Sequence, residues 1–367
     1  MRQLRVVDTA HPLRVLEALQ GALAGGPAVL PHPGNPDGLP ATVEQRVAVV
    51  IETSGSTGRP KRVALGADAV LASAAAADVQ LGGPGQWLLA VPAHYIAGVN
   101  VLVRSLASQT EPAIMPAGHF GAERFVEAAA RLVEPRRYTA LVPAQLTRLI
   151  ESDAALDTLR RFDRILLGGQ AVPVALAARA LELGLNLTRT YGSSETSGGC
   201  VWDGVPIGDT EVRTVQGRVE IAGSVLAHGY LADPQRTAAA FVEEHGRRWY
   251  RTDDTGTLTD GVLAVSGRID DVIVSGGVKV SLAEIESVVR ELPGLDDAVV
   301  VAAPHPAWGE TPVVVGTREV SLEVLRSAVS SRLGSAAAPS RMIVVDAIPL
   351  TATGKPDRPS LTTLALQ

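Results

Sequence analysis

Cysteine is almost absent from this chain, because Cys200 is the only one among 367 residues. A single cysteine excludes a disulfide bond within the chain, so the composition favours a reducing compartment, and we expect a cytoplasmic protein. Long apolar runs are also lacking. No stretch is long enough to cross a bilayer, and the first sixteen residues, MRQLRVVDTAHPLRVL, contain no continuous apolar segment of the kind that a secretion signal needs. We therefore expect no membrane partner.

The chain also lacks a concentrated basic region. Its 33 lysines and arginines are scattered, and against 39 acidic residues they leave a net charge of −6, which argues against nucleic acid as a partner. Hydrophobic residues make up 46% and charged residues 20%, as in an ordinary globular enzyme. The length predicts two or three domains. Because the net charge is negative and the basic residues are scattered, a small anionic substrate would need a local cationic pocket.

Glycine and hydroxyl residues crowd into one segment, TSGSTGRPK, that follows the apolar run Val47–Ile51. The run predicts a buried strand, and the turn after it offers backbone N–H groups, hydroxyls and one ammonium to a polyphosphate. Arg59 and Pro60 stand before the lysine, so the segment is not a Walker A loop. A flexible surface turn is the alternative. The predicted phosphate-binding residues are Thr53, Ser54, Gly55, Ser56, Thr57, Gly58 and Lys61.

Helix and strand patterns alternate over the first part of the chain, which predicts an α/β fold with mostly parallel sheets covered by helices. Residues 1–45 show one helix and then an irregular Pro/Gly-rich loop. The expected helices cover residues 13–23, 67–80, 125–133 and 145–151, and the expected strands cover residues 47–51, 87–91, 140–142 and 164–167.

From about Gly217 short strands and turns replace this pattern, which indicates a small antiparallel-rich subdomain. Beyond Asp270 a compact α+β pattern begins, with Ser281 and Glu284 as the capping box of a helix. We therefore predict a large N-terminal domain, residues 1–269, and a smaller C-terminal domain, residues 270–367.

A second polar segment, RTYGSSETSGG at 189–199, combines an aromatic ring, glycines, hydroxyls and a carboxylate. Tyr191 offers a flat face to a purine, Ser194 a hydroxyl to an acyl or phosphoryl oxygen, and Glu195 a hard oxygen ligand to Mg²⁺. A polar turn with a capping glutamate is the alternative. Upstream, Gly168, Gly169 and Gln170 follow the strand RILL, where bare backbone can lie against a purine ring or can simply form a turn.

Two further segments add charged candidates. In WYRTDDTG, Asp254 can accept hydrogen bonds from the two hydroxyls of a ribose, and Arg268 in GRIDD can hold the same ribose or a phosphate. Near the C-terminus, TATGKP exposes Lys355 on a loop that can reach a site elsewhere. Each of these residues taken alone is more typical of a solvated surface.

Five motifs in order resemble the signature series of the acyl-adenylate-forming superfamily, which includes acyl-CoA synthetases, adenylation domains and luciferases. They are TSGSTGRPK, YGSSET, YRTDD, GRIDDVIVSGGVKV and TATGK, and the match spans residues 47–356. Two positions depart from the family pattern. Ser194 replaces a threonine and keeps its hydroxyl, whereas Asp253 replaces a glycine and adds a second carboxylate beside the expected ribose acceptor. The register of the motif selects Asp254.

The resemblance implies a set of ligands and roles. ATP and a small-molecule carboxylic acid would be substrates, CoA a co-substrate and Mg²⁺ the metal. Lys355 would contact the α-phosphate and the carboxylate, Glu195 would bind Mg²⁺, and the 53–61 loop would hold the β- and γ-phosphates. Gly192 would belong to the ATP site with Tyr191. The C-terminal domain would be mobile about a hinge at Asp270 and would carry the catalytic lysine.

Within the superfamily, the compact length together with PAHYIAGVNVLVRSL and YGSSETSGGCVWDG is similar to the actinobacterial o-succinylbenzoate–CoA ligases of menaquinone biosynthesis. His94, Tyr95 and Arg104 lie where the family builds its acyl pocket, although a core histidine and a surface ion pair are the ordinary alternatives. Two other functions stay open: a ligase for another aryl or fatty acid, or a nucleotide-binding module without chemistry. A homodimer is compatible with the sequence.

Overall fold

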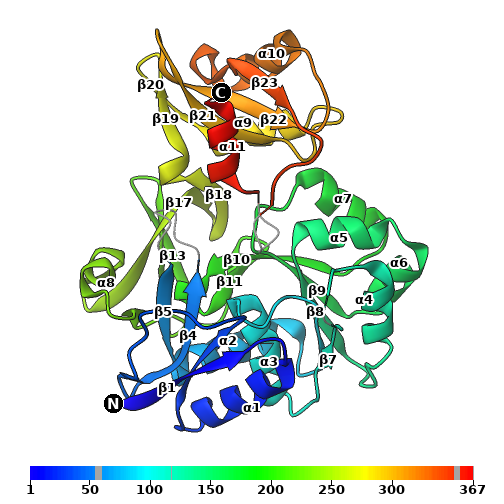
Figure 1. Ribbon diagram of the computed structural model, residues 1–367, viewed down its shortest axis with the longest axis vertical. Helices are drawn as coiled ribbons and strands as arrows, with labels where there is room; N and C mark the ends of the chain where they lie inside the picture. Colours follow the sequence, from blue (N-terminus) through cyan, green and yellow to red (C-terminus); the bar gives the residue numbers. More distant parts are fainter. Residues whose placement is uncertain (54–59, 117, 351–355, 367) are drawn as a thin grey trace.

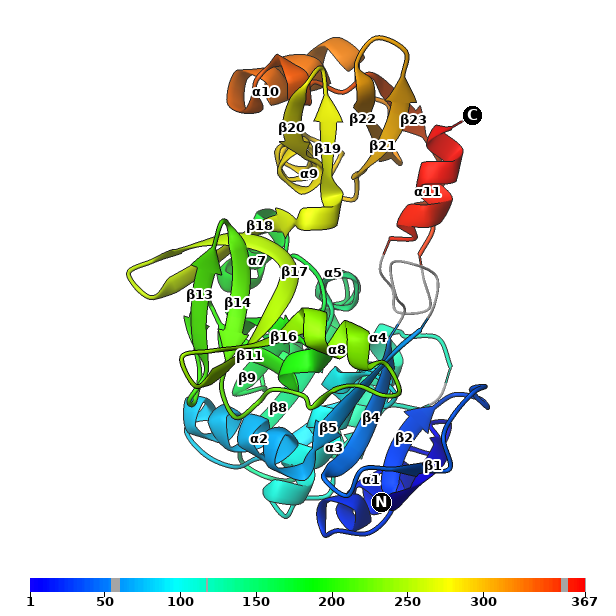
Figure 2. The same ribbon diagram turned by 90° about the vertical axis from the view of Figure 1, so that its left-hand side faces the viewer.

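The molecule has a larger part and a smaller part, which carry the N-terminal and C-terminal elements respectively (Figures 1 and 2). The computed structural model describes residues 1–53, 60–116, 118–350 and 356–366. The larger part contains three β-sheets and the smaller part a fourth, so the predicted α/β architecture with a smaller α+β part is confirmed. Among the described residues, no helix is long and apolar enough to cross a membrane.

A six-stranded mixed sheet contains the N-terminal strands. In spatial order they are β15 (Gly229–Tyr230), β5 (Lys61–Gly66), β4 (Val47–Thr53), β2 (Ala28–His32), β1 (Arg2–Asp8) and β3 (Thr42–Val43). β1, β2 and β4 are parallel, whereas β4 and β5 form an antiparallel pair. β4 is buried on both faces, since Val49 and Ile51 join one core cluster and Val47 and Val50 join another. This double burial explains its continuous apolar run.

A seven-stranded sheet forms the second layer of strands. In spatial order it contains β12 (Val205–Pro206), β11 (Gly198–Trp202), β10 (Leu187–Ser193), β9 (Arg164–Leu167), β8 (Arg137–Leu141), β6 (Gln86–Leu89) and β7 (Ala113–Ile114). β7, β6, β8, β9 and β10 are parallel, and β11 and β12 continue the sheet in antiparallel fashion. The carboxyl ends of the parallel strands meet at one edge, where ligands of open α/β sheets bind.

Helices lie between the six-stranded and the seven-stranded sheet, and other helices cover the opposite face of the seven-stranded sheet. α2 (Ala67–Leu81) and α3 (Ile96–Ala107) share a core cluster with strands of both sheets, so they lie between them. α2 ends at Gly82, whose φ of +75° is the left-handed conformation that glycine adopts readily. The remaining helices of this region are α1 (Pro12–Leu23), which packs on β1 and α3, and, over the other face of the seven-stranded sheet, α4 (Ala122–Ala129), α5 (Pro143–Ile150), α6 (Asp153–Leu159) and α7 (Val174–Glu182) (Figure 1).

The third sheet is antiparallel throughout, as the sequence predicts. Its strands are β13 (Glu211–Val215), β14 (Arg218–Ala222), β17 (Arg247–Thr259) and β16 (Phe241–Glu244), with β18 (Val262–Arg268) paired to the second half of β17. The short helix α8 (Pro234–Ala240) leads into β16. Glu220 on β14 is 1% exposed and binds Arg213 at 2.5 Å and Arg251 at 3.0 Å. This network holds β17 in place upstream of Asp254.

The smaller part follows a 3₁₀ turn, Ile269–Asp271. Its elements are β19 (Val272–Ser275), β20 (Val278–Ser281), α9 (Leu282–Arg290), β21 (Val299–His305), β22 (Gly309–Gly316), α10 (Leu322–Leu333), β23 (Arg341–Val344) and α11 (Arg358–Ala365). Its buried side chains form clusters of their own, which contain no residue before Ile273. The Ser281 hydroxyl accepts from the Glu284 backbone N–H, as a capping residue should. The boundary at residue 269/270 and the mobility of this part stay predictions.

Two expectations about local structure were wrong. Residues 1–45 contain the strands β1 and β2 besides the expected helix, because these strands complete the six-stranded sheet. β5 also intervenes between the 53–61 segment and α2, where the sequence predicted a direct passage into the helix. Lys61 consequently begins a strand, and it pairs with Thr53 across the antiparallel β4–β5 ladder.

Glu286 on α9 offers a direct test of what holds the C-terminal helix in place. Its carboxylate is 7% exposed and binds Arg358 of α11 at 2.7 Å, Arg290 at 2.8 Å and the Val300 backbone N–H at 3.0 Å. We expect Glu286→Gln to lower the free energy of unfolding by about 1 to 3 kcal/mol, less than for fully buried pairs because both arginines are partly exposed. Urea unfolding measures this loss. The control, Glu284→Gln on the exposed face of the same helix, should change stability little, and equal losses would contradict the interpretation.

Candidate functional site

The site begins with a hydrogen bond between the second and third sheets. The Tyr191 hydroxyl on β10 donates to Asp254 Oδ2 on β17 at 2.7 Å. Upstream on β17, the buried hydroxyl of Thr252 donates to the Val219 carbonyl at 2.8 Å and accepts from the Asp254 backbone N–H at 3.1 Å. Both the backbone and the carboxylate of Asp254 are therefore held in one place. The sequence named Tyr191 and Asp254 separately, and the structure brings them together.

Asp253 and Asp254 differ clearly in their surroundings. The Asp254 side chain is 25% exposed and that of Asp253 is 50% exposed. Successive side chains of a strand point to opposite faces, and among the described residues only Asp254 receives the Tyr191 hydroxyl. The geometry therefore favours Asp254 as the ribose acceptor, in agreement with the register of the motif.

Arg268 links this carboxylate to the start of the smaller part. It is the registered partner of Asp254 across the β17–β18 ladder. Its guanidinium lies 3.6 Å from Asp254 and 3.6 Å from Asp253, and it forms two hydrogen bonds with Asp270 at 2.7 and 2.9 Å. One cation is thus shared among three carboxylates, one of which belongs to the predicted hinge residue Asp270.

The pKa values follow from this arrangement. Burial raises the pKa of Asp254, and the hydrogen bond from Tyr191 and the charge of Arg268 offset only part of that effect. Burial would also raise the pKa of Asp270, but the hydrogen bond and charge of Arg268 outweigh it, so that pKa is lowered. Burial and the neighbouring carboxylate of Asp254 raise the pKa of Tyr191, so its hydroxyl stays a donor at neutral pH.

Ser194 and Glu195 lie in a 3₁₀ turn directly after β10, and both are 6% exposed. The Glu195 backbone carbonyl accepts from the Ala227 N–H at 2.8 Å, and its Oε1 atom accepts from the Tyr230 hydroxyl at 2.8 Å. No described lysine or arginine forms an ion pair with this carboxylate. A buried carboxylate with one neutral donor is costly unless a cation joins it.

This donor set fits Mg²⁺. The ion is commonly held by one or two carboxylates together with substrate phosphates. Within the described residues there is no group of three His, Cys, Asp or Glu that could hold a metal alone, so phosphates would have to complete the coordination. Lys61 Nζ lies 6.0 Å from the centre of the Tyr230 ring and so stands on the same side of the molecule as Glu195.

Several predicted residues lie outside the described part of the chain. They are Ser54, Gly55, Ser56, Thr57, Gly58 and Lys355. The two ends of the 53–61 segment are described, and Thr53 and Lys61 face each other in the β4–β5 ladder. The placement of Lys61 near the ring of Tyr230 agrees with a phosphate-binding role, which stays a prediction.

The glycines of the site are explained by close packing. A Cβ on Gly168 would lie 2.3 Å from Thr190 Oγ1, and one on Gly192 would lie 2.1 Å from the Gly198 carbonyl oxygen. Gly169 has a φ of +80° and allows the chain to turn after β9. Gln170 follows it. These residues lie at the carboxyl ends of β9 and β10, where the sequence placed them, and a purine-binding role is untested.

The predicted acyl-pocket residues are not all together. His94 and Tyr95 precede α3, with ring centres 4.0 Å apart, and burial together with the charge of His32 lowers the pKa of His94. Arg104 lies eight residues after Ile96, the first residue of α3, which is about 12 Å along the helix axis at 1.5 Å per residue. Its guanidinium is 4% exposed and lies 5.1 Å from the centre of the Trp87 ring.

Arg104 has an unusual electrostatic environment. Burial lowers its pKa to about 10, although the charge of Asp78 acts in the opposite direction. Its Nε atom is buried without a hydrogen-bond partner, and no described carboxylate lies within ion-pair distance. The surface ion pair that the sequence offered as an alternative is therefore not formed with any described residue.

Sequence reasoning missed Tyr230, which contacts Glu195, and Arg236, whose guanidinium lies 5.7 Å from the Tyr230 ring centre. Tyr230 belongs to a two-residue strand, too short to produce a periodic signal. It also missed the pair of Glu52 with Arg62 at 2.8 Å and with His32 at 3.3 Å near the ends of β4 and β2. No local pattern marks these residues.

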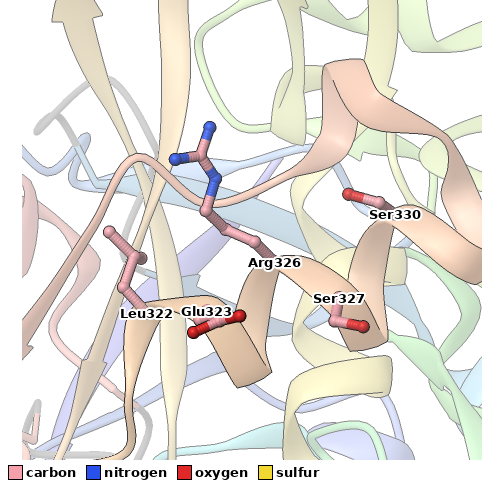
Figure 3. Close-up of a pocket in the computed structure, with 5 residues that line it drawn as sticks. All are labelled: Leu322, Glu323, Arg326, Ser327 and Ser330. Atoms are coloured by element: carbon pink, nitrogen blue, oxygen red, sulfur yellow. The ribbon is translucent and has the colours of Figure 1, made fainter.

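Two surface hollows lie among the described residues, and the second of them borders Thr237 and Phe241, which contact Tyr230. One, of about 420 Å³, is a shallow depression on α10 lined by Leu322, Glu323, Arg326, Ser327 and Ser330 (Figure 3). Another, of about 490 Å³, includes Arg248, whose guanidinium already donates to the carbonyls of Ala227 and His228. Neither hollow offers a better site than the cluster around Asp254 and Glu195.

Comparison with known proteins agrees with this geometry. A family model described as AMP-binding enzyme matches residues 5–234, and one described as AMP-binding enzyme C-terminal domain matches residues 284–355. A Mycobacterium tuberculosis H37Rv protein named probable 2-succinylbenzoate–CoA ligase is 38% identical over 98% of this chain and 97% of its own length. The 2-succinylbenzoate–CoA ligase of Lactococcus lactis is 27% identical over 85% of this chain and 70% of its own length.

Solved structures show the same fold. The o-succinylbenzoate CoA synthetase of Bacillus subtilis, in complex with its acyl-adenylate intermediate, has a TM-score of 0.74 and 26% identity, and the match covers 86% of this chain and 69% of that one. The amide bond synthetase of Marinactinospora thermotolerans has a TM-score of 0.78 and 26% identity, with coverage of 100% and 80%.

The raised pKa of Asp254 predicts how stability depends on pH. A folded-state pKa above the ordinary value of 3.8 means that the folded protein holds the proton more tightly than the unfolded chain. Stability is therefore lost as the pH rises from 3.8 through the folded pKa. We expect Asp254→Asn to raise the free energy of unfolding at pH 7, with a gain that fades towards pH 4. Urea unfolding at pH 4 and pH 7 measures this gain in the free energy of unfolding. Asp253→Asn is the control, and an equal gain in the two variants would contradict the prediction.

Proposed function

Because this chain belongs to the AMP-binding enzyme family, we propose that it is an AMP-forming acid–CoA ligase that activates o-succinylbenzoate with ATP and transfers it to CoA, a step of menaquinone biosynthesis. The observation that carries the chemistry is Asp254, held by Tyr191 and Arg268 at the junction of the two parts of the molecule. The choice of acid rests on the Mycobacterium tuberculosis relative, which matches nearly the whole chain at 38% identity.

The nucleoside half of ATP lies across β10 and β17. The Tyr191 ring stacks on the adenine, with Gly168, Gly169, Gln170 and Gly192 allowing the close approach of backbone. Asp254 accepts hydrogen bonds from the ribose hydroxyls, and Arg268 holds the carboxylate in position. The ionised form of Asp254 is required, since only a carboxylate can accept from both hydroxyls of a vicinal diol.

The triphosphate extends towards Glu195 and Lys61. Bound Mg²⁺ supplies Lewis-acid neutralisation of the phosphoryl oxygens. Glu195 provides the carboxylate for this ion, Lys61 adds a fixed positive charge, and Thr53 with the residues after it donates to the β- and γ-phosphates. Ser194, buried next to Glu195, directs its hydroxyl to the acyl or phosphoryl oxygens.

In the first half-reaction, a carboxylate oxygen of the acid attacks the α-phosphorus, the bond to the bridging oxygen of the β-phosphate breaks, and pyrophosphate leaves. Lys355 stabilises the charge on the α-phosphate and the carboxylate. In the second half-reaction, the CoA thiolate attacks the acyl carbon and AMP leaves. The C-terminal part rotates about Asp270 between the two steps, which requires the Arg268–Asp270 hydrogen bonds at 2.7 and 2.9 Å to open.

The acid is recognised by residues from the two ends of α3. His94 and Tyr95 contact the aromatic part near the start of the helix, and Arg104 in its last turn, without an ion pair among the described residues, receives the second carboxylate. A buried guanidinium without a partner is costly, and a dicarboxylic acid removes this cost on binding. The cytoplasmic location and a homodimer stay predictions from the sequence.

The test is a panel of acids, each assayed for ATP-dependent pyrophosphate release and for thioester formation, with and without CoA. We expect o-succinylbenzoate to give both products and to have the highest kcat/KM. A higher kcat/KM for another aryl or fatty acid would show that this acid, and not o-succinylbenzoate, is the substrate. Adenylate formation without any thioester would point to a carrier protein as the acceptor, and no pyrophosphate with any acid would indicate a module that only binds nucleotide.

Arg104→Leu tests the second carboxylate contact. We expect KM for o-succinylbenzoate to rise at least tenfold, on the order of 1.4 kcal/mol, with KM for ATP unchanged. Because the wild-type guanidinium has no ion-pair partner among the described residues, the variant should keep its thermal midpoint. An unchanged KM for the acid together with a lower midpoint would show that Arg104 is only structural.

A further inference from the structure

Within the described part of the chain, Tyr230 makes the only side-chain hydrogen bond to the Glu195 carboxylate. Its hydroxyl donates to Oε1 at 2.8 Å, and no described group donates to Oε2. Both side chains are buried, with 8% of Tyr230 and 6% of Glu195 exposed. The hydrogen bond therefore sets the rotation of the carboxylate and determines which of its two oxygens stays available to a ligand.

The backbone around Tyr230 is held firmly. Tyr230 pairs with Val63 of β5, and its N–H donates to Thr237 Oγ1 at 2.9 Å. The preceding residue has to be glycine, since a Cβ on Gly229 would lie 2.3 Å from the Thr237 side chain. The chain thus approaches α8 closely enough for Thr237 to anchor the tyrosine.

The ring of Tyr230 is held from several directions. It packs against Phe241 with 6.1 Å between ring centres, and Phe241 packs against Tyr250 at 5.1 Å. Lys61 Nζ lies 6.0 Å and the Arg236 guanidinium 5.7 Å from its centre.

We propose that Tyr230 is a positioning residue for the metal-binding carboxylate: it fixes Glu195 Oε1 by a hydrogen bond and presents Oε2 to the Mg²⁺ that accompanies ATP. This inference rests on the proposed function, in which Glu195 holds that ion. Residues that orient a metal ligand commonly change metal affinity 10- to 100-fold when they are removed. Tyr230 also joins Lys61 and Glu195 through one ring, so the phosphate-binding lysine and the metal carboxylate are placed relative to each other.

The experiment compares Tyr230→Phe with the wild type by calorimetric titration of ATP in the absence of the acid. Phenylalanine keeps the ring and its packing and removes only the donor. We expect the Mg²⁺ concentration that half-saturates ATP binding to rise at least tenfold, with ATP affinity in EDTA unchanged. The matched control is Tyr138→Phe, which removes a tyrosine hydroxyl that donates to the Leu81 and Gly83 carbonyls instead of Glu195 and should leave the Mg²⁺ dependence as in the wild type. Thermal midpoints show that both variants fold.

Two other outcomes would overturn the inference. If Tyr230→Phe weakens ATP binding equally with Mg²⁺ and with EDTA, or does not alter it, Tyr230 does not position the metal carboxylate. Glu195→Gln separates this failure from that of the proposed function. When Glu195→Gln abolishes the Mg²⁺ dependence and Tyr230→Phe does not change it, only the inference fails. When Glu195→Gln itself has no effect, Glu195 does not hold the metal, and both fail.

Discussion

The Arg268 guanidinium holds the site together, because it contacts both Asp254 and Asp270, and Asp270 lies in the turn that leads into the smaller part of the molecule. Its position is set by the β17–β18 ladder, where it is the registered partner of Asp254. From there it reaches Asp254 and Asp253 at 3.6 Å each and Asp270 at 2.7 Å. The orientation of the ribose acceptor and the start of the smaller part therefore depend on one cation.

Three charged groups of the site are poorly compensated by the protein alone. Asp254 is buried enough that its pKa is raised, Glu195 has one neutral donor, and Arg104 is buried without an ion pair among the described residues. Each costs free energy in the ligand-free protein. Each would be compensated by a group that the proposed substrates carry: two ribose hydroxyls, a Mg²⁺–phosphate complex and a second carboxylate. Electrostatic preorganisation of this kind is how active sites stabilise developing charge.

Much of the fold could be predicted because the hydrophobic patterns are local. The strand Arg164–Leu167 was predicted at its observed bounds, and the helix predicted over residues 67–80 is observed as Ala67–Leu81, followed by Gly82 at a positive φ. β1 and β2 could not be recognised in the same way, since their stability comes from pairing within the sheet, β1 with β2 and β2 with β4, rather than from their own pattern. β5 was missed because the glycine-rich segment before it is typical of a loop leading into a helix.

The candidate site was predicted less evenly than the fold. Tyr191, Asp254, Arg268 and Glu195 were identifiable because they stand in ordered motifs, and the structure brings the first three into contact. Tyr230 was not identifiable, because it lies in a two-residue strand that has no sequence pattern of its own. Its position near the site is set only when β15 pairs with β5. Arg104 was named, but its depth below the surface depends on how α3 packs on Trp87. The position of Tyr230 and the burial of Arg104 both depend on tertiary packing, which cannot be inferred from a single sequence.

The most direct measurement of the central claim is a crystal structure of the protein with bound AMP. The account predicts the ribose hydroxyls within hydrogen-bond distance of both carboxylate oxygens of Asp254, the adenine against Tyr191, and Arg268 still in contact with Asp254. A nucleotide whose ribose binds Asp253 instead, or one that lies away from the β10 and β17 strands, would contradict it.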